Sequence, residues 1–196
     1  MVSQKSNEKG FSYIDVMIAV VIMMVGVLAM VGALTANLMR SYEGERRIVA
    51  KQLALSTLES IISAKEITRT GVLDGWPSIR NVSASPTPGV ADGVFLNGWC
   101  PVREEMGYDG VAGTIDDACS GTGSCIVSGR PPNTSSLISG FDRQIVITDV
   151  ADPERPPPNA ISRRRIDVSV RFYVNKSPRI ETASTIVTNY YTEPEN

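Results

Sequence analysis

The sequence predicts an α+β fold, in which one long N-terminal helix packs on a small antiparallel β-sheet. Two observations carry this prediction. An unbroken apolar run covers residues 16–39 and continues into a stretch without proline that has apolar residues at helical spacing. The C-terminal third, in contrast, alternates apolar with polar residues, as half-buried strands do. The 196 residues suit one modest globular domain beside the helix.

The apolar run is long enough to cross a membrane. About 24 residues rising 1.5 Å each cover roughly 36 Å, against about 30 Å for the hydrocarbon core of a bilayer. Residues 1–10 are short and polar, which indicates a removable leader. A secretory signal peptide has its small cleavage residue after a shorter apolar region, whereas Gly10 comes before this one. A cut at Gly10 would therefore leave the helix attached to the product.

The order of residues around this point is distinctive: Lys9, Gly10, an aromatic Phe11, then Ser-Tyr-Ile, an acid at Asp15 and the apolar helix. It resembles the N-terminus of type IV prepilins and of the pseudopilins of type II secretion. An ordinary N-terminal anchor helix is the alternative, but it gives no reason for a carboxylate at the edge of the hydrocarbon, where charge costs free energy.

The resemblance has several implications. A prepilin peptidase would cut between Gly10 and Phe11 and methylate the new amine of Phe11. Asp15 would stand where the family usually has Glu, at the fifth mature position, and would serve subunit assembly. The partners would be other pilin or pseudopilin subunits. The chain would cross the bacterial inner membrane once, with its C-terminal domain in the periplasm or outside the cell on a filament.

Residues 11–40 are thus expected to form the transmembrane or filament-core helix, and residues 41–70 its amphipathic continuation. The apolar residues of this second part recur at helical spacing: Ile48, Leu55, Leu58 and Ile62, joined by Ala54 and Ile61. We expect this stripe to cover the globular domain. A bare coiled coil is the alternative, but fewer than four heptads are available for it. Gly44 is a possible bend, and Gly71 a plausible C-cap.

Residues 71–140 are rich in Gly, Pro, Ser, Asn and Asp, which predicts a loop-rich region. The resemblance implies that this is the variable part of the chain. Short strand candidates occur there only at residues 94–96 and 126–127. Residues 141–196 predict an antiparallel meander of three strands, at 141–150, 165–174 and 180–191. A proline-rich loop joins the first two strands, and a tight turn at residues 175–178 joins the last two. Arg163, Arg164 and Arg165 are interpreted as a solvated strand end.

The loop of residues 108–117 contains three carboxylates separated by glycines, Asp109, Asp116 and Asp117. Several oxygens on so short a loop are what Ca²⁺ prefers, so we predict a calcium site there. The spacing is not that of an EF-hand, and the loop is similar to calcium-holding loops of some pseudopilins. The alternative is a solvated acidic turn, with Asp-Gly chosen for its backbone conformation.

Composition excludes several classes of function. The chain has no histidine, which removes Ser-His-Asp and Cys-His nucleophiles and the commonest zinc ligands, so we do not expect an enzyme. A formal charge of −2 argues against a general nucleic-acid binder. Three cysteines follow the apolar run, and an exported domain can form one disulfide from them. Cys119 and Cys125 are the first candidates for this disulfide, although Cys100 can pair with either of them.

These observations favour a minor pilin or pseudopilin, whose role is assembly rather than catalysis. Within this class, the sequence does not separate a type IV pilus from a type II secretion pseudopilus. A pilus-borne adhesin or DNA-binding module is the alternative from another class.

Overall fold

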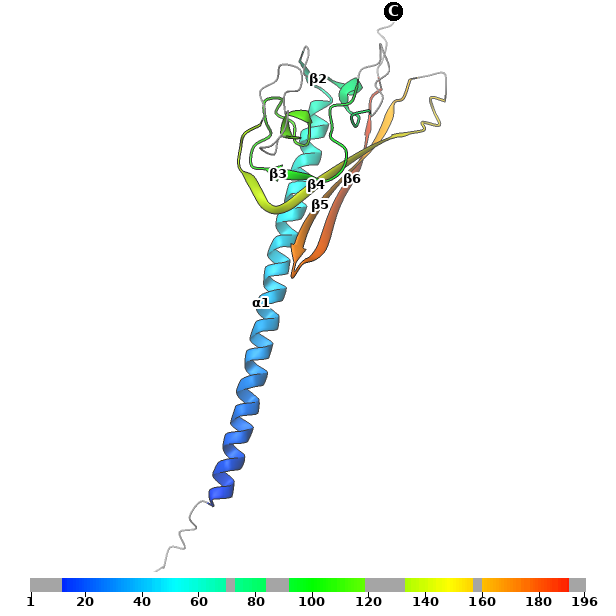
Figure 1. Cartoon of the computed structure of the whole chain (residues 1–196). Helices are drawn as coiled ribbons and strands as arrows, with labels where there is room; N and C mark the ends of the chain where they lie inside the picture. Colours follow the sequence, from blue (N-terminus) through cyan, green and yellow to red (C-terminus); the bar gives the residue numbers. More distant parts are fainter. Residues whose placement is uncertain (1–11, 70–72, 84–91, 119–132, 157–159, 191–196) are drawn as a thin grey trace, which may run out of the picture. The chain divides into compact units, whose positions relative to one another are not determined.

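The computed structural model describes residues 12–69, 73–83, 92–118, 133–156 and 160–190 (Figure 1). The helical elements are α1 (Tyr13–Ala64) and the short 3₁₀ turns η1 (Trp76–Ser78) and η2 (Ile115–Ala118). The strands are β1 (Thr68–Arg69), β2 (Leu73–Asp74), β3 (Cys100–Arg103), β4 (Leu137–Val150), β5 (Arg163–Val174) and β6 (Ser177–Thr188). The chain divides into two units, Met1–Glu45 and Arg46–Asn196, and each is described by itself.

The first unit contributes residues 13–45 of α1, which are helical throughout. Gly26, Gly32 and Gly44 do not interrupt the helix, and nothing lies within 4 Å of the place where a side chain would begin at any of them. In the part of the chain that the structure describes, α1 is the one helix long and apolar enough to span a membrane. This finding is consistent with a single-pass membrane protein.

In the second unit, residues 46–64 of α1 pack on the sheet. The buried residues of this segment are mostly small: Ala50, Ala54, Thr57, Leu58, Ser60, Ile61 and Ala64. They recur every three or four positions and so form one face of the helix. Small side chains on this face let the helix backbone approach the strands closely. The predicted packing of an amphipathic half-helix on an antiparallel sheet is therefore confirmed.

The stripe that makes this contact differs from the predicted one. Leu58, Ala54 and Ile61 are buried, but Ile48, Leu55 and Ile62 are 61%, 44% and 40% exposed. These three residues are spaced by seven and lie on another face of the helix. The prediction counted apolar size and missed Ala50 and Ala64, which are buried on the same face as Ala54.

The sheet has four strands in the order β3-β4-β5-β6, and every neighbouring pair is antiparallel. Its last three strands form the predicted meander. Along β5, alternate residues are buried against the helix, from Arg164 through Ile166 and Val168 to Val174. The core joins helix, loops and strands: Ala50, Ala54, Leu58, Ile61, Ala64, Ile79, Val94, Phe95, Val102, Val111, Phe141, Ile145, Ile166, Val168, Val170, Phe172 and Val174.

A two-residue turn joins β5 to β6. Asn175 and Lys176 both have positive φ, 48° and 68°. This is the conformation of the tight hairpin turn whose twist matches that of the strands, and Asn tolerates it well. The turn confirms the predicted tight connection and fixes the register of the hairpin, with Val174 opposite Ser177.

Three expectations about local structure were wrong. β3 was not predicted, because Pro101 within it argues against a strand. Of residues 94–96, only Phe95 pairs, through isolated bridges to Asn81 and Thr114. The helix ends at Ala64, before residue 70, because the β-branched Ile67 packs on the core and Thr68 begins β1. Residues 126–127 and Gly71 lie outside the described residues.

Candidate functional site

The N-terminal turn of α1 contains the predicted assembly residue, Asp15. The backbone N–H of Ser12 donates to Oδ2 of Asp15 at 3.3 Å, and the N–H of Asp15 donates to the carbonyl of Ser12 at 2.9 Å. This is half of a capping box, and an acid also complements the positive end of the helix dipole. Asp15 is exposed and is the only charged residue among residues 13–39. The predicted cleavage residues Gly10 and Phe11 lie outside the described residues.

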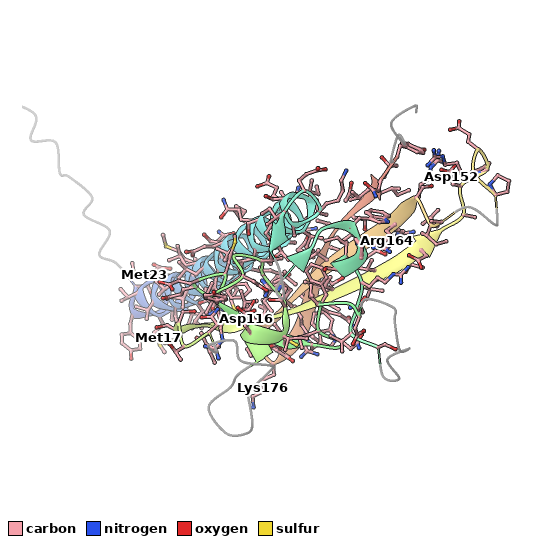
Figure 2. The ribbon with its side chains drawn as sticks, turned by 90° about the horizontal axis from the view of Figure 1, so that it is seen from above. Met17, Met23, Asp116, Asp152, Arg164 and Lys176 are labelled. Carbon is pink, nitrogen blue, oxygen red and sulfur yellow. The ribbon has the colours of Figure 1, made fainter. Side chains whose placement is uncertain are left out.

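The surface around Asp15 is continuous and apolar. In Figure 2, Met17 and Met23 extend outward from the helix. The large apolar residues of the segment are 48 to 77% exposed: Tyr13, Ile14, Val16, Met17, Ile18, Val20, Val21, Ile22, Met23, Met24, Val25, Val27, Leu28, Met30, Val31, Leu34, Leu38 and Met39. A soluble monomer rarely exposes so large an apolar patch, so this segment needs lipid or other helices around it.

The acidic loop between β3 and β4 is built around Asp116. Its Oδ2 accepts the backbone N–H of Tyr108 at 2.9 Å and that of Asp109 at 3.4 Å, and its Oδ1 accepts the Thr114 hydroxyl. Gly107, with φ of +73°, leaves room for this carboxylate, because a Cβ there would meet Oδ2 at 2.4 Å. Asp116 is buried (Figure 2). Because its carboxylate accepts these three hydrogen bonds, it holds the turn together.

Asp117 connects the loop to the rest of the fold. Its Oδ2 accepts the N–H of Gly113 at 2.7 Å and Nη2 of Arg143 at 3.4 Å, while Oδ1 accepts Nδ2 of Asn133 at 2.6 Å. Arg143 also donates to the Thr57 hydroxyl on α1 at 3.1 Å. Burial lowers the pKa of Arg143, and the Asp117 carboxylate opposes this effect. The pair therefore joins loop, sheet and helix inside the core.

Asp109 is the third carboxylate, and its position is different. Oδ1 accepts the N–H of Val111 at 2.8 Å, but the buried Oδ2 has no hydrogen-bond partner in the described part of the chain. The pKa of Asp109 is raised to about 6, chiefly by burial; hydrogen bonds from Thr114 and Val111 act to lower it, and the charges of Asp116 and Asp117 act to raise it. This is the one carboxylate oxygen of the loop that keeps its full capacity as an acceptor.

Within the described ranges, no three acidic or cysteine side chains are grouped as metal ligands. Asp116 and Asp117 already accept hydrogen bonds from the protein at both oxygens, so this loop is held together by its own donors. The alternative of a solvated turn was wrong for these residues, because all three carboxylates are buried. Calcium binding stays a prediction.

Cys100 lies at the start of β3, where it is half-buried, and burial raises the pKa of its thiol. Cys119 and Cys125 lie outside the described residues, so the pairing of the cysteines stays a prediction.

The arginine run was interpreted wrongly at its middle residue. Arg164 is 2% exposed, donates from Nε to Asp149 at 3.0 Å and stacks on the ring of Trp76 at 4.3 Å (Figure 2). Arg143 was missed altogether. Both arginines occupy inward positions of their strands: Arg143 lies between buried Phe141 and Ile145, and Arg164 comes two residues before buried Ile166. A basic residue at such a position signals a buried partner, and this signal was available in the sequence.

Comparisons with protein-family models, with curated proteins and with solved structures find no match to this chain.

Proposed function

We propose that this protein is a minor pilin or pseudopilin, which a prepilin peptidase cuts after Gly10 and methylates at Phe11, and which assembles into a type IV pilus-like filament. One observation carries the proposal. Residues 13–39 form a helix whose surface is apolar on every side and carries one charge, Asp15, in its first turn. In a plain membrane anchor that acid would cap the first turn of the helix, but a carboxylate at the edge of the hydrocarbon costs free energy.

In the proposed mechanism, the helix moves from the inner membrane into a filament. In the inner membrane the exposed apolar residues contact lipid, and Asp15 reaches water at the headgroups. In a filament the same residues contact the helices of other subunits, and that water is lost. The positive group then available to Asp15 is the amine of Phe11 on a neighbouring subunit. Pairing these two groups neutralises both and sets the axial register between subunits.

The exposed stripe of Ile48, Leu55 and Ile62 supports the same proposal. These residues are not used by the sheet, and their spacing of seven is that of a seam between packed helices. They extend the apolar contact surface beyond the membrane-spanning part into the segment that carries the head. The C-terminal domain is then presented in the periplasm or outside the cell.

The test is mass spectrometry of the N-terminus of the protein purified from membranes. We expect the chain to begin at Phe11 with one added methyl group. Gly10→Val should accumulate as the uncleaved precursor, because the peptidase must approach the backbone at that point, whereas Gly10→Ala should be processed slowly. Normal processing of the valine variant, or a mature chain that still begins before Phe11, would contradict the proposal.

A further inference from the structure

The last strand of the sheet, β6, has one edge with unused backbone groups. The two-residue turn makes Val174 and Ser177 a hydrogen-bonded pair, and in an antiparallel ladder such pairs alternate along the strands. Odd-numbered residues of β6 therefore bond to β5, and even-numbered residues direct their N–H and C=O groups away from the sheet. Among the described residues, none bonds to the backbone of the four central outward residues: Ile180, Thr182, Ser184 and Ile186.

At the opposite edge of the sheet, the backbone groups of β4 are covered. β3 covers one end of β4, and beyond β3 the side chain of Asn81 takes the place of a strand. Its Nδ2 donates to the carbonyl of Ile145 at 2.9 Å, and its Oδ1 accepts the N–H of Ile147 at 2.8 Å. Natural proteins commonly block exposed edges in such ways. On β6, Pro178 occupies the first outward position, and Nζ of Lys65 donates to the carbonyl of Thr188, the last one, at 3.0 Å, so residues 180–186 are left open.

The outer face beside this edge contains a cation with free donors. Arg165 lies opposite Ile186 and donates from Nε to Oδ1 of Asp167 at 3.0 Å. Its side chain is 57% exposed, and in the described part of the chain its Nη groups have no partner. Arg165 lines a shallow depression of about 390 Å³ together with Ser184, Thr185 and Ile186. A guanidinium with free Nη groups favours a carboxylate.

We propose that residues 180–186 of β6 bind an extended, acidic segment of a different protein, which adds a strand to the sheet and places a carboxylate on Arg165. Main-chain hydrogen bonds supply the affinity in this mode, and side chains supply the specificity. Charge favours such a partner, because Arg165 is exposed and the outer face of residues 180–186 carries no acidic side chain.

A second copy of this chain fits the edge less well. If two β6 strands pair about Ala183, Ile180 of one lies opposite Ile186 of the other, which suits both apolar side chains. However, the outer face of β6 supplies only Ile, Thr and Ser beside Arg165, since Glu181 lies on the other face. Self-pairing therefore leaves the Nη groups without a carboxylate. The inference does not depend on the proposed function.

The experiment uses the full chain in detergent micelles and two fluorescent peptides of alternating Thr and Val, one with a central Glu and one with Gln. We expect the Glu peptide to bind, by fluorescence anisotropy, and Thr182→Pro to weaken binding about tenfold or more, because it removes an outward N–H. Thr182→Ala, which keeps that N–H, should bind like wild type. Arg165→Gln should weaken the Glu peptide about tenfold and leave the Gln peptide unchanged.

Two measurements distinguish a loss of binding from a loss of folding. The melting temperature of Thr182→Pro should match that of Thr182→Ala, because both lose the hydroxyl contact with Ser169 and this N–H is not part of the β5–β6 ladder. If the variant unfolds, a Glu peptide methylated on alternate amides replaces it and should fail to bind the wild-type chain. Equal binding of the Glu and Gln peptides, binding that survives the proline or the methylation, or absence of binding would overturn the proposal. So would dimerisation through β6 in sedimentation, which would assign the edge to a second copy.

Discussion

Residues 13–45 and residues 46–64 belong to one helix, but different interactions hold them. In the first segment the large apolar side chains are exposed all round the helix, and the most apolar stretch of the helix has none of its residues buried. In the second, one face of small residues is buried against strands, and the other faces remain exposed. The difference teaches that hydrophobicity alone does not locate the core of this protein. The most apolar segment is the one that the fold itself does not cover.

The largest effect is expected from the one charge of the first segment. Asp15→Ala should be inserted and cleaved normally but fail to enter filaments, because the unpaired amine of a neighbour in the dry filament core costs several kcal/mol. Asp15→Glu should assemble, since it keeps the charge and restores the side chain usual in the family. The measurement is the amount in sheared filaments relative to the membrane pool. Equal incorporation of the alanine variant would refute the charge pair and indicate a tip position.

The second segment depends on a different kind of pair. Arg143→Ala should destabilise the head by about 3–5 kcal/mol, because it leaves Asp117 buried without its cation. Arg171→Ala is a matched control on the same sheet. Its bond to Asp142, 2.8 Å long, joins partly exposed side chains, so its loss should cost about 1 kcal/mol or less. Denaturant unfolding followed by tryptophan fluorescence measures both. Similar losses for the two variants would show that the buried pair has no special role.

Apolar truncations compare the two segments directly. Ile61→Ala should lower the free energy of unfolding of the head by about 2–5 kcal/mol, since Ile61 is fully buried and the cavity cannot close completely. Ile18→Ala removes the same atoms from an exposed position of the first segment and should leave unfolding of the head unchanged. The same unfolding assay, on full chains in micelles, distinguishes them. An equal loss in both variants would mean that the head depends on the membrane-spanning segment for its stability.

Much of this contrast could be predicted from local sequence patterns. The apolar run, the alternation of β5 and the tight turn at Asn175 each depend on neighbours along the chain, and each was predicted. Features that depend on distant segments were not. Pro101 concealed β3, whose pairing is decided by β4, and the buried role of Arg143 depends on Asp117 and Thr57. The acidic loop illustrates the same limit, because its sequence did not reveal that its own backbone N–H groups donate to the three carboxylates.

The smallest effect concerns Asp109. It distinguishes a loop that binds calcium from one in which Asp109 is a buried, protonated acid. In the fold its pKa is about 6, against about 4 in an unfolded chain, so folding favours the protonated acid. Its contribution to stability is therefore complete below about pH 4 and is lost as the pH rises through 6. The full difference corresponds to nearly 3 kcal/mol, which screening by nearby solvent reduces to about 1–2 kcal/mol. Asp109→Asn should gain this amount at pH 7.5 without calcium and differ little from wild type at pH 4.

With calcium, we expect the opposite order of stability for wild type and Asp109→Asn. If the loop binds the ion, millimolar calcium should raise the melting temperature of wild type at pH 7.5, because only the folded state binds it, and Asp109→Asn should lose this response. Asp116→Ala and Asp117→Ala are less suitable tests, since they also remove hydrogen bonds that hold the turn. Absence of any calcium shift in wild type, together with a more stable Asn variant, would leave Asp109 as a buried acid that the fold keeps protonated. Unlike the carboxylate of Asp15, which the proposed assembly requires as a charge, this one would be most stable without its charge.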